Sequence, residues 1–348
     1  MLNDIVKPLT EWYRQNKRSL PWRDRHNAYY TWVSEIMLQQ TRVEAVKPYF
    51  RRFTEELPDP AALAECPEEK LLKLWEGLGY YNRVRNMQIA AQTVVEEYDG
   101  VLPASYEKLL SLKGIGSYTA GAIASIAYDI PVPAVDGNVL RVITRIIEDD
   151  GDIMKQSVKK RIENKLQEIM PGEYPGDFNQ ALMELGAVVC VPNGEPKCDV
   201  CPVAFCCGAR AHGTINRFPV KAQKKDRKLE DRTVLVIQDG EKTAIRRRPS
   251  RGLLAGLYEL PNLKGHLSEE EVLESVKAMD LEPLRIEALP EAKHIFSHIE
   301  WRMTAYRVRV SSLEEIRQND LLFVGKRQSD DQYAIPSAFS AYTKYIRE

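Results

Sequence analysis

The sequence lacks several features that would place it in a special class. Its 348 residues carry a formal net charge of −1, and no apolar stretch is long enough to span a membrane. The first residues form a mixed-charge segment without the apolar core of a targeting peptide, and no internal repeat is present. We therefore expect a cytoplasmic protein of two domains that does not bind membranes. A net charge near zero neither requires nor excludes a nucleic-acid partner.

Cysteine is scarce, yet all but one of the six cysteines lie within one short segment, residues 190–207. Four thiolates so close together favour a single metal centre, and both zinc and an iron–sulfur cluster accept such a set. The loop between Cys190 and Cys198 carries two prolines and a glycine, so a metal would have to order it. A disulfide framework is disfavoured because no secretory signal is present. A group of unrelated buried small residues is the remaining alternative.

The distribution of apolar residues divides the chain into two kinds of structure. Residues 29–128 predict successive helices, because apolar residues recur at helical spacing between glycines and prolines, and helical character continues over 159–185. A basic run without apolar period, residues 216–231, predicts a linker. The last third predicts strands around one helix, over 233–237, 268–279 and 301–310. We expect an all-α region followed by an α+β domain.

A turn with two glycines, Gly114 and Gly116, separates two of the expected helices. It exposes backbone N–H groups, and the next helix begins directly after the segment Leu112–Ser117, with its positive end at the turn. This geometry holds a phosphate without any charged side chain. A plain helical corner that uses glycine for its dihedral angles is the alternative.

Two acidic residues are candidates for acid–base chemistry. Glu35 lies at the edge of the apolar arc of a helix expected over 31–41, where partial desolvation would raise its pKa and let it donate a proton. A solvated glutamate on the helix face is the alternative. Asp136 precedes a helical segment, so it suits an N-cap with or without a catalytic role. One protonated and one ionised carboxyl group in a pocket would suit cleavage of a glycosidic bond.

Together these segments resemble the adenine-specific mismatch DNA glycosylases of the helix–hairpin–helix, or endonuclease III, superfamily. The matching segments are Leu20–Arg23, Trp32–Thr41, Glu76–Tyr81, the Gly114 hairpin, Val135–Asn138 and Asn179–Met183. The resemblance implies a helix–hairpin–helix glycosylase region over 1–215. Its parts would be a six-helix part at about 23–129, a cluster part at 1–22 and 130–215, and a cluster loop at 190–207.

The resemblance assigns roles to the candidate residues. It implies that Glu35 protonates N7 of a flipped-out adenine, that ionised Asp136 stabilises the sugar cation and that Asn138 orients both. Tyr118 stands where bifunctional relatives have a lysine that forms a Schiff base, which implies a monofunctional enzyme with Tyr118 near the sugar. A tyrosine on the helix face is the alternative.

The DNA contacts come from the same matched segments. Gln40 and Tyr80 match family positions that enter the base stack, although Tyr80 also suits a packed core aromatic. The full set of implied DNA-binding residues is Trp22, Arg23, Gln39, Gln40, Leu78, Tyr80, Gly114, Gly116 and Ser117.

The resemblance favours a [4Fe–4S] cluster over zinc at the cysteines. The implied ligands are Cys190, Cys198, Cys201 and Cys207, and the family spacing favours Cys207 over Cys206. The interval from Cys190 to Cys198 is one residue longer than the family pattern, and an irregular loop can absorb that residue.

Residues 252–261 resemble the Nudix-like C-terminal domain of these glycosylases, here expected over 232–348. The helix expected over 268–279 has no Arg-Glu pair of the kind that magnesium-dependent Nudix hydrolases use, so we expect recognition without hydrolysis. Phe296, Ser297 and His298 match the family loop that contacts 8-oxoguanine at the base edge. A simple turn at a strand end is the alternative.

We therefore expect a monomeric DNA N-glycosylase of base excision repair that acts on the nucleoid. Its partner would be double-stranded DNA containing adenine opposite 8-oxoguanine or guanine, and repair or replication proteins are further candidates. One alternative is a bifunctional endonuclease III-like glycosylase with lyase activity, which Tyr118 and the C-terminal domain disfavour. The other is a non-catalytic iron–sulfur DNA-binding protein, which the matched positions of Glu35 and Asp136 disfavour.

Overall fold

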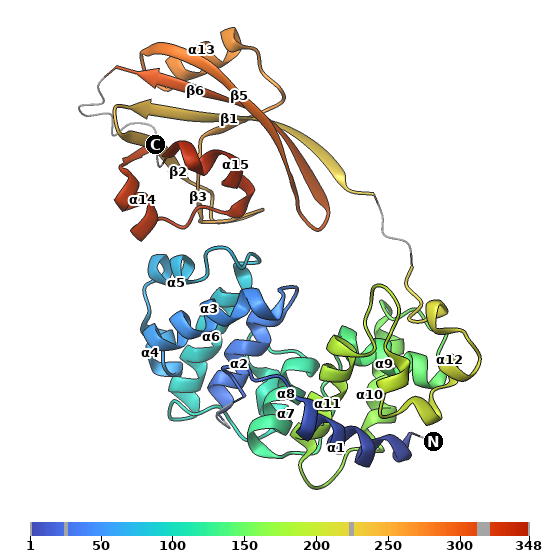
Figure 1. Ribbon diagram of the computed structural model, residues 1–348. Helices are drawn as coiled ribbons and strands as arrows, with labels where there is room; N and C mark the ends of the chain where they lie inside the picture. Colours follow the sequence, from blue (N-terminus) through green and yellow to red (C-terminus); the bar gives the residue numbers. More distant parts are fainter. Residues whose placement is uncertain (1, 24–26, 223–225, 312–320, 347–348) are drawn as a thin grey trace. The chain divides into compact units, whose positions relative to one another are not determined.

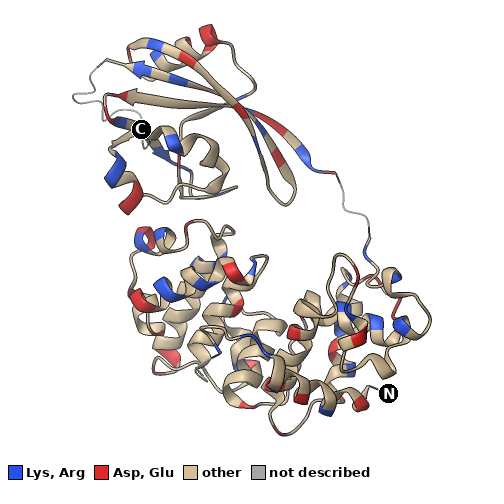
Figure 2. Cartoon of the chain, in the orientation of Figure 1, with Lys and Arg blue, Asp and Glu red and all other residues tan. Residues whose placement is uncertain are grey.

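The structure is a computed structural model that describes residues 2–23, 27–222, 226–311 and 321–346 (Figure 1). The chain divides into two compact units, one of residues 1–66 and 83–223 and one of residues 67–82 and 224–348. Residues 223–225 of the expected linker lie outside the described residues. Within the described ranges, no helix is both long and apolar enough to cross a bilayer. Figure 2 shows acidic and basic residues intermingled in both units, in keeping with the small net charge.

The first unit is built from helices. One core gathers the apolar faces of several of them, with Tyr13, Ile143, Ile162 and Phe178 buried almost completely. The helices are α1 (Val6–Asn16), α2 (Ala28–Leu38), α3 (Val43–Glu56), α4 (Pro60–Glu65), α6 (Asn82–Glu97), α7 (Tyr106–Ser111), α8 (Ser117–Tyr128), α9 (Gly137–Ile147), α10 (Gln156–Gln167), α11 (Pro175–Val188) and α12 (Gly208–Ala211).

Helix α2 ends earlier than the sequence predicts. It spans Ala28–Leu38 rather than 31–41, and Gln40 adopts a left-handed backbone with φ of 60°. The side chain of Arg83 explains the early end, since its Nη1 donates to the carbonyls of Ile36 at 2.6 Å and Gln39 at 2.8 Å. An arginine that satisfies the last carbonyls of a helix replaces the bonds that a further turn would supply.

The segment that leads into α9 is held by one buried amide. Asn179, fully buried in α11, accepts the Ala134 N–H at 3.0 Å and donates to Ser125 Oγ at 2.8 Å and to the Val132 carbonyl at 2.9 Å. These bonds join α11, the end of α8 and the extended segment in front of Asp136. Buried polar groups must be paired, so Asn179 fixes where α9 begins.

Glycine is required in the turn before α8 and in α11 beside the start of α9. Gly114 has φ of +80°, and a Cβ there would lie 2.7 Å from Cβ of Asn86. A Cβ on Gly186 of α11 would lie 2.6 Å from Cβ of Asn138. A side chain at either position would therefore push apart the elements that carry the turn and the start of α9.

The second unit contains one mixed sheet, in which the described part of the chain contributes seven strands. The order is β3-β2-β1-β6-β5, with β4 paired to β1 and β7 paired to β2; β1 and β6 are parallel, whereas the other pairs are antiparallel. The strands are β1 (Lys228–Asp239), β2 (Lys242–Arg247), β3 (Tyr258–Glu259), β4 (Asn262–Lys264), β5 (Pro283–Ile295), β6 (Ile299–Val310) and β7 (Leu321–Val324).

Successive side chains of β1 point to opposite faces of the sheet, and both faces are buried. Val234 and Val236 belong to one core, with Trp301 and Phe339, and Leu235 and Ile237 belong to the other. Helix α13 (Glu269–Lys277) packs on the second face, and its N-terminus is a capping box in which Ser268 and Glu271 bond each other's backbone. Helices α14 (Lys326–Gln332) and α15 (Ser340–Thr343) lie on the other side of the sheet (Figure 1).

The segment 67–82 joins the second unit through its helix α5 (Glu68–Leu74). Lys73 Nζ donates to the carbonyls of Ser329 at 3.3 Å and Tyr333 at 3.0 Å, and the Ile335 N–H donates to Glu76 Oε1 at 2.8 Å. The expected fold class is confirmed by the helical region followed by an α+β domain.

Candidate active site

A buried glutamate in α2 forms the first element of the site. Glu35 is 7% exposed, and the hydroxyl of Tyr118 on α8 donates a short hydrogen bond to its Oε2. The pKa of Glu35 is raised to about 7, because burial and, less strongly, nearby Asp136 raise it more than the bond from Tyr118 and the charge of Arg23 lower it. A carboxyl group with this pKa is partly protonated at neutral pH, so it can donate a proton.

The second carboxyl group stands at the start of α9. Asp136 is the N-cap, since its Oδ1 accepts the Val139 N–H at 2.7 Å. Its other oxygen accepts from Asn138 Nδ2 at 2.8 Å, and Asn138 in turn accepts from Arg141 Nη2 at 2.9 Å. Burial raises the pKa of Asp136, and the bonds from Val139 and Asn138 and the charge of Arg141 lower it. The N-cap role that the sequence offered is present, and it leaves Oδ2 directed to Asn138.

Glu35, Tyr118, Asp136 and Asn138 line one cavity of about 780 Å³. This volume is in the range of pockets that enclose small ligands. Its walls include the predicted DNA-binding residues Trp22, Arg23, Gln39 and Gln40, together with Arg18, Gln180, Met183 and Glu184.

One wall of this cavity rests on a fully buried carboxylate. Glu184 of α11 accepts from Arg18 Nε at 2.6 Å and from Arg23 Nη2 at 2.7 Å, and both arginines line the cavity. Burial works against ionisation, but the bonds from the two arginines outweigh it and lower the pKa of Glu184. Trp22 is nearly buried and packs edge-on against Phe50 with ring centroids 5.4 Å apart, so it belongs to the wall.

The glycine turn leads directly into α8. Gly116 is the N-cap, and the Ser117 hydroxyl donates to Glu163 of α10 at 2.9 Å. Gly114 and Gly116 are exposed, whereas Ile115 between them is buried. The turn therefore presents backbone to solvent and anchors itself through one aliphatic side chain.

Four of the five clustered cysteines share a small apolar cavity. Cys190, Cys198, Cys201 and Cys207 line it, with a volume of about 30 Å³, and Cys206 does not. Arg145 Nη1 lies 3.2 Å from Cys190 Sγ and donates to it. Among the described residues, no three His, Cys, Asp or Glu side chains are arranged to hold a single metal ion. Four thiols around a common cavity are the donor set that an iron–sulfur cluster requires.

The expected lesion-contacting tripeptide is the turn between β5 and β6 in the second unit. Ser297 and His298 are exposed there, and Phe296 is half-buried. The hydroxyls of Ser297 and Tyr80 lie 2.8 Å apart. Tyr80 is 51% exposed, so it is not a packed core aromatic, whereas Leu78 is buried.

The sequence matches known families along most of its length. Residues 33–171 match the family model of the HhH-GPD superfamily base excision DNA repair proteins, and residues 233–345 match that of the NUDIX domain. An adenine DNA glycosylase of Mus musculus is 36% identical, over 86% of this chain and 69% of that protein. The chain belongs to the adenine DNA glycosylase family. Another adenine DNA glycosylase, of Buchnera aphidicola (strain APS), is 31% identical over 87% of this chain and 86% of that protein.

Solved structures share the fold of about three fifths of this chain. A thermostable thymine-DNA glycosylase has a TM-score of 0.54 at 25% identity and covers 60% of this chain and 96% of its own. A trapped endonuclease III–DNA covalent intermediate has a TM-score of 0.52 at 23% identity. The match covers 61% of this chain and 96% of that chain, and it shows the fold alone. The predicted family, the helical core with its Nudix-like domain, and the enzyme class of DNA N-glycosylase are confirmed.

Several residues of this glycosylase site carry no role in the sequence-based prediction. Glu184 could have been identified as an ionisable residue inside the apolar helix that precedes the cysteines. Arg18 could have been identified by its place just before Leu20–Arg23. Arg141 joins the site to the cysteine loop, since its Nε donates to the Cys190 carbonyl at 2.9 Å. No sequence signal separates Arg141 from any other basic residue on a helix, because its bonds to the Cys190 and Gly186 carbonyls are long-range.

Proposed function

We propose that this member of the adenine DNA glycosylase family removes adenine mispaired with 8-oxoguanine or guanine, by monofunctional hydrolysis of the N-glycosidic bond. The observation that carries the proposal is the buried Glu35, with its pKa near 7, which shares a cavity with Asp136. Two carboxyl groups whose surroundings differ suit an acid and a charge stabiliser. The cavity can accept a base only after the nucleotide leaves the duplex.

The first step in this proposal is proton transfer to the base. Protonated Glu35 gives its proton to N7 of the flipped-out adenine, and the C1′–N9 bond then breaks with its electron pair moving to the base. Tyr118 donates to Glu35 Oε2 and so holds the carboxyl group in one orientation. It also stabilises the carboxylate that remains after transfer, which makes proton donation less costly.

The second step concerns the sugar cation that bond breaking leaves. Ionised Asp136 faces this positive charge and stabilises it, and water then adds to C1′ and releases its proton. Asn138 fixes the orientation of Asp136 Oδ2, and the α9 N-cap bond fixes Oδ1. Tyr118 offers no amine, so no Schiff base forms at its position and the backbone of the DNA stays intact.

The cysteine loop suits a [4Fe–4S] cluster held by Cys190, Cys198, Cys201 and Cys207. Support comes from the four thiols around one cavity and from the exclusion of Cys206 from that cavity. Bound there, a cluster would order the 190–207 loop and would supply no atom to the reaction. Arg145 would keep its hydrogen bond to Cys190 Sγ, as arginines often do at anionic sulfur.

The second unit would supply recognition of the opposite base. Ser297 is exposed at the β5–β6 turn and carries a hydroxyl that can donate to or accept from a base edge. Tyr80 and Gln40 would occupy the gap that the flipped nucleotide leaves. The three glutamates that begin α13 include Glu271, which the capping box already uses, so magnesium-dependent hydrolysis is not part of this proposal.

The test is a single-turnover assay on duplexes that contain one A:8-oxoguanine pair, with and without treatment by hot alkali. Monofunctional excision gives free adenine and a strand that breaks only after alkali. Strand breaks without alkali would mean lyase activity, and no adenine release would mean that the protein only binds DNA. A duplex with A:T at the same position is the control.

A further inference from the structure

The β5–β6 turn is closed by two hydrogen bonds of its backbone. The Phe296 N–H donates to the Ile299 carbonyl at 2.8 Å, and the Lys228 N–H donates to the His298 carbonyl at 3.0 Å. The phenyl ring of Phe296 is placed by ring packing instead. Its centroid lies 4.9 Å from that of Trp301 and 4.6 Å from that of His294, edge-on in both cases.

Trp301 is the fixed point of this packing. It is fully buried at the start of β6, and its Nε1 donates to Glu230 Oε2 at 3.2 Å. Two guanidinium groups lie over its ring, with Cζ of Arg232 at 4.9 Å and Cζ of Arg248 at 5.9 Å from the centroid. Cation–π contacts of this kind are strongest where water is excluded.

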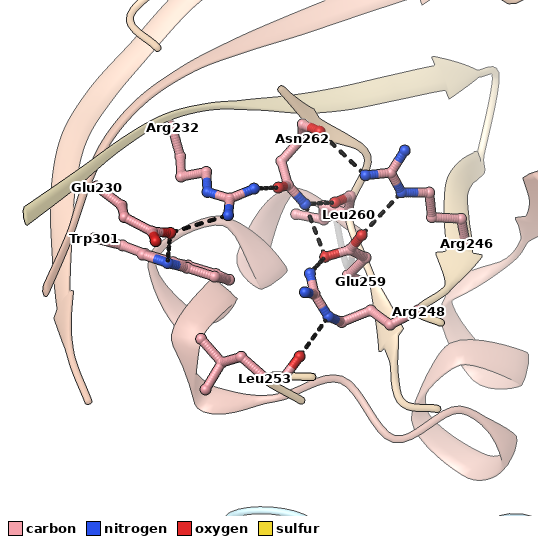
Figure 3. A network of polar contacts seen from close by, with 9 residues as sticks. All are labelled: Glu230, Arg232, Arg246, Arg248, Leu253, Glu259, Leu260, Asn262 and Trp301. Carbon is pink, nitrogen blue, oxygen red and sulfur yellow. Dashed lines mark hydrogen bonds and ion pairs between the residues drawn. The ribbon is translucent and has the colours of Figure 1, made fainter. Parts of the chain in front are cut away.

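The two arginines are held in place by one buried carboxylate. Glu259 is 2% exposed and accepts from Arg246 Nε at 2.9 Å, from Arg248 Nη1 over a short distance and from Asn262 Nδ2 at 2.8 Å. Asn262 Oδ1 accepts from Arg232 Nη1 at 3.2 Å. Figure 3 shows these side chains converging from four strands and from the segment that follows β2.

This network gives each charged group more than one partner. Arg248 also donates from Nε to the Leu253 carbonyl at 2.9 Å, and Arg232 donates from Nη2 to Glu230 Oε2 at 3.1 Å. A planar guanidinium with several fixed bonds has little freedom to move, so the face that it presents to Trp301 is fixed. Members of a polar network that share several hydrogen bonds are held in a single arrangement, although Arg232 Nε has no hydrogen-bond partner within the described part of the chain.

We propose that Arg248 and Trp301 are positioning residues for lesion specificity: through Phe296 they set the turn that presents Ser297 to the opposite base. The inference rests on the proposed function of the turn. The path runs from buried Glu259 to Arg248, over the Trp301 ring to Phe296, whose next residue is Ser297. None of the network residues needs to touch DNA for this effect.

The test compares single-turnover excision from A:8-oxoguanine and A:G duplexes by full-length variants. Arg248→Met keeps most of the stem and removes the charge, while Arg246 and Asn262 continue to satisfy Glu259. We expect the rate ratio of A:8-oxoguanine to A:G to fall about three- to tenfold, with the A:G rate unchanged. Arg248→Lys, which keeps a charge over the ring, should recover part of the ratio.

A matched control separates positioning from loss of stability. Val276→Ala on α13 opens a small cavity in the core on the opposite face of the sheet, far from this network. It should lower the melting temperature and leave the ratio unchanged. The ¹⁹F resonance of 5-fluorotryptophan at Trp301, assigned with Trp301→Phe, should shift more with A:8-oxoguanine than with A:G duplex in the wild type.

Ser297→Ala completes the experiment, because it tests the proposed function by itself. A lower ratio for Ser297→Ala but not for Arg248→Met overturns the positioning role alone. An unchanged ratio for Ser297→Ala overturns lesion recognition by this turn. If Arg248→Met lowers both rates equally, the positioning role is overturned. If Arg248→Met does not fold, the Trp301 resonance of the wild type decides: an equal shift with the two duplexes overturns the inference.

Discussion

The side-chain hydroxyls of Tyr80 and Ser297 lie 2.8 Å apart, although 216 residues separate them in the sequence. Both belong to the second unit, since the segment 67–82 groups with the C-terminal part of the chain. Tyr80 has a left-handed backbone, with φ of 48°, and lies next to Gly79 with φ of 68°. The residue proposed to enter the base stack is thus hydrogen-bonded to the turn proposed to contact 8-oxoguanine.

Tyr80→Phe should weaken binding to an A:8-oxoguanine duplex by up to about tenfold, because an exposed hydrogen bond contributes ~0.5–1.5 kcal/mol and the ring is retained. Binding to an A:G duplex should change less. Fluorescence anisotropy on both duplexes measures the effect, and Tyr174→Phe, at another exposed tyrosine, is the control. Equal losses on the two duplexes would show that the hydroxyl of Tyr80 has no part in lesion recognition.

Glu35→Gln should fold and bind mismatched DNA but release adenine about 10²- to 10⁴-fold more slowly, since it keeps the side-chain volume and loses the proton donor. Single-turnover rates measure this, and binding affinity shows that the site is still formed. Near-normal base release by this variant would remove Glu35 from the mechanism.

Tyr118→Phe should move the pH dependence of excision upward. The reaction needs protonated Glu35, so the rate falls as pH rises through the pKa of Glu35, about 7. The bond from Tyr118 lowers that pKa, and its removal should therefore shift the alkaline limb to higher pH. Single-turnover excision rates measured from about pH 5.5 to about pH 9, on both sides of that pKa, show the shift.

Tyr128→Phe is the matched control for this pH profile. Tyr128 lies at the other end of α8 and donates to the Leu102 carbonyl, away from the cavity. Its profile should coincide with that of the wild type. A downward shift in Tyr118→Phe would mean that the phenol does not stabilise the ionised form of Glu35.

Glu35 should also make the stability of the protein depend on pH. Burial raises its folded pKa from 4.5 to about 7, so the unfolded chain releases a proton that the folded protein retains between these values. The free energy of unfolding is therefore highest below pH 4.5, with respect to this group. It falls by about 3 kcal/mol as the pH rises through the folded pKa of about 7. Urea unfolding of wild type and Glu35→Gln at pH 5 to 8, roughly this window, measures it. A difference between the two proteins that is constant with pH would contradict the raised pKa.

Cys198→Ser and Cys206→Ser should differ in iron content. Cys198 lines the shared cavity and Cys206 does not. We expect about four irons per chain in the wild type and in Cys206→Ser, by the stoichiometry of a [4Fe–4S] cluster. Cys198→Ser should lose iron and soluble yield. Stoichiometric zinc without iron in protein purified in the absence of oxygen would overturn the cluster assignment.

The sequence by itself determined most helices of the first unit, two strands and one helix of the second unit, and the kind of chemistry. Helical periodicity gave the helices of the first unit, and β-branched and alternating residues gave β1 and β6. Glu35, Asp136, the glycine turn and the cysteines were all visible as residue types at suggestive spacing. Local signals suffice here because caps, turns and amphipathic faces depend on a few neighbouring residues.

Only the tertiary structure decided which of these residues act together. Glu35 and Tyr118 meet although α2 and α8 are far apart in the chain, and the pKa of Glu35 depends on that burial. The early end of α2 follows from Arg83, a residue on another helix. The ionisation of buried Glu184 likewise depends on Arg18 and Arg23, which lie 166 and 161 residues earlier in the sequence. Long-range ion pairs leave no periodic pattern in the sequence, so they can be identified only in the folded structure.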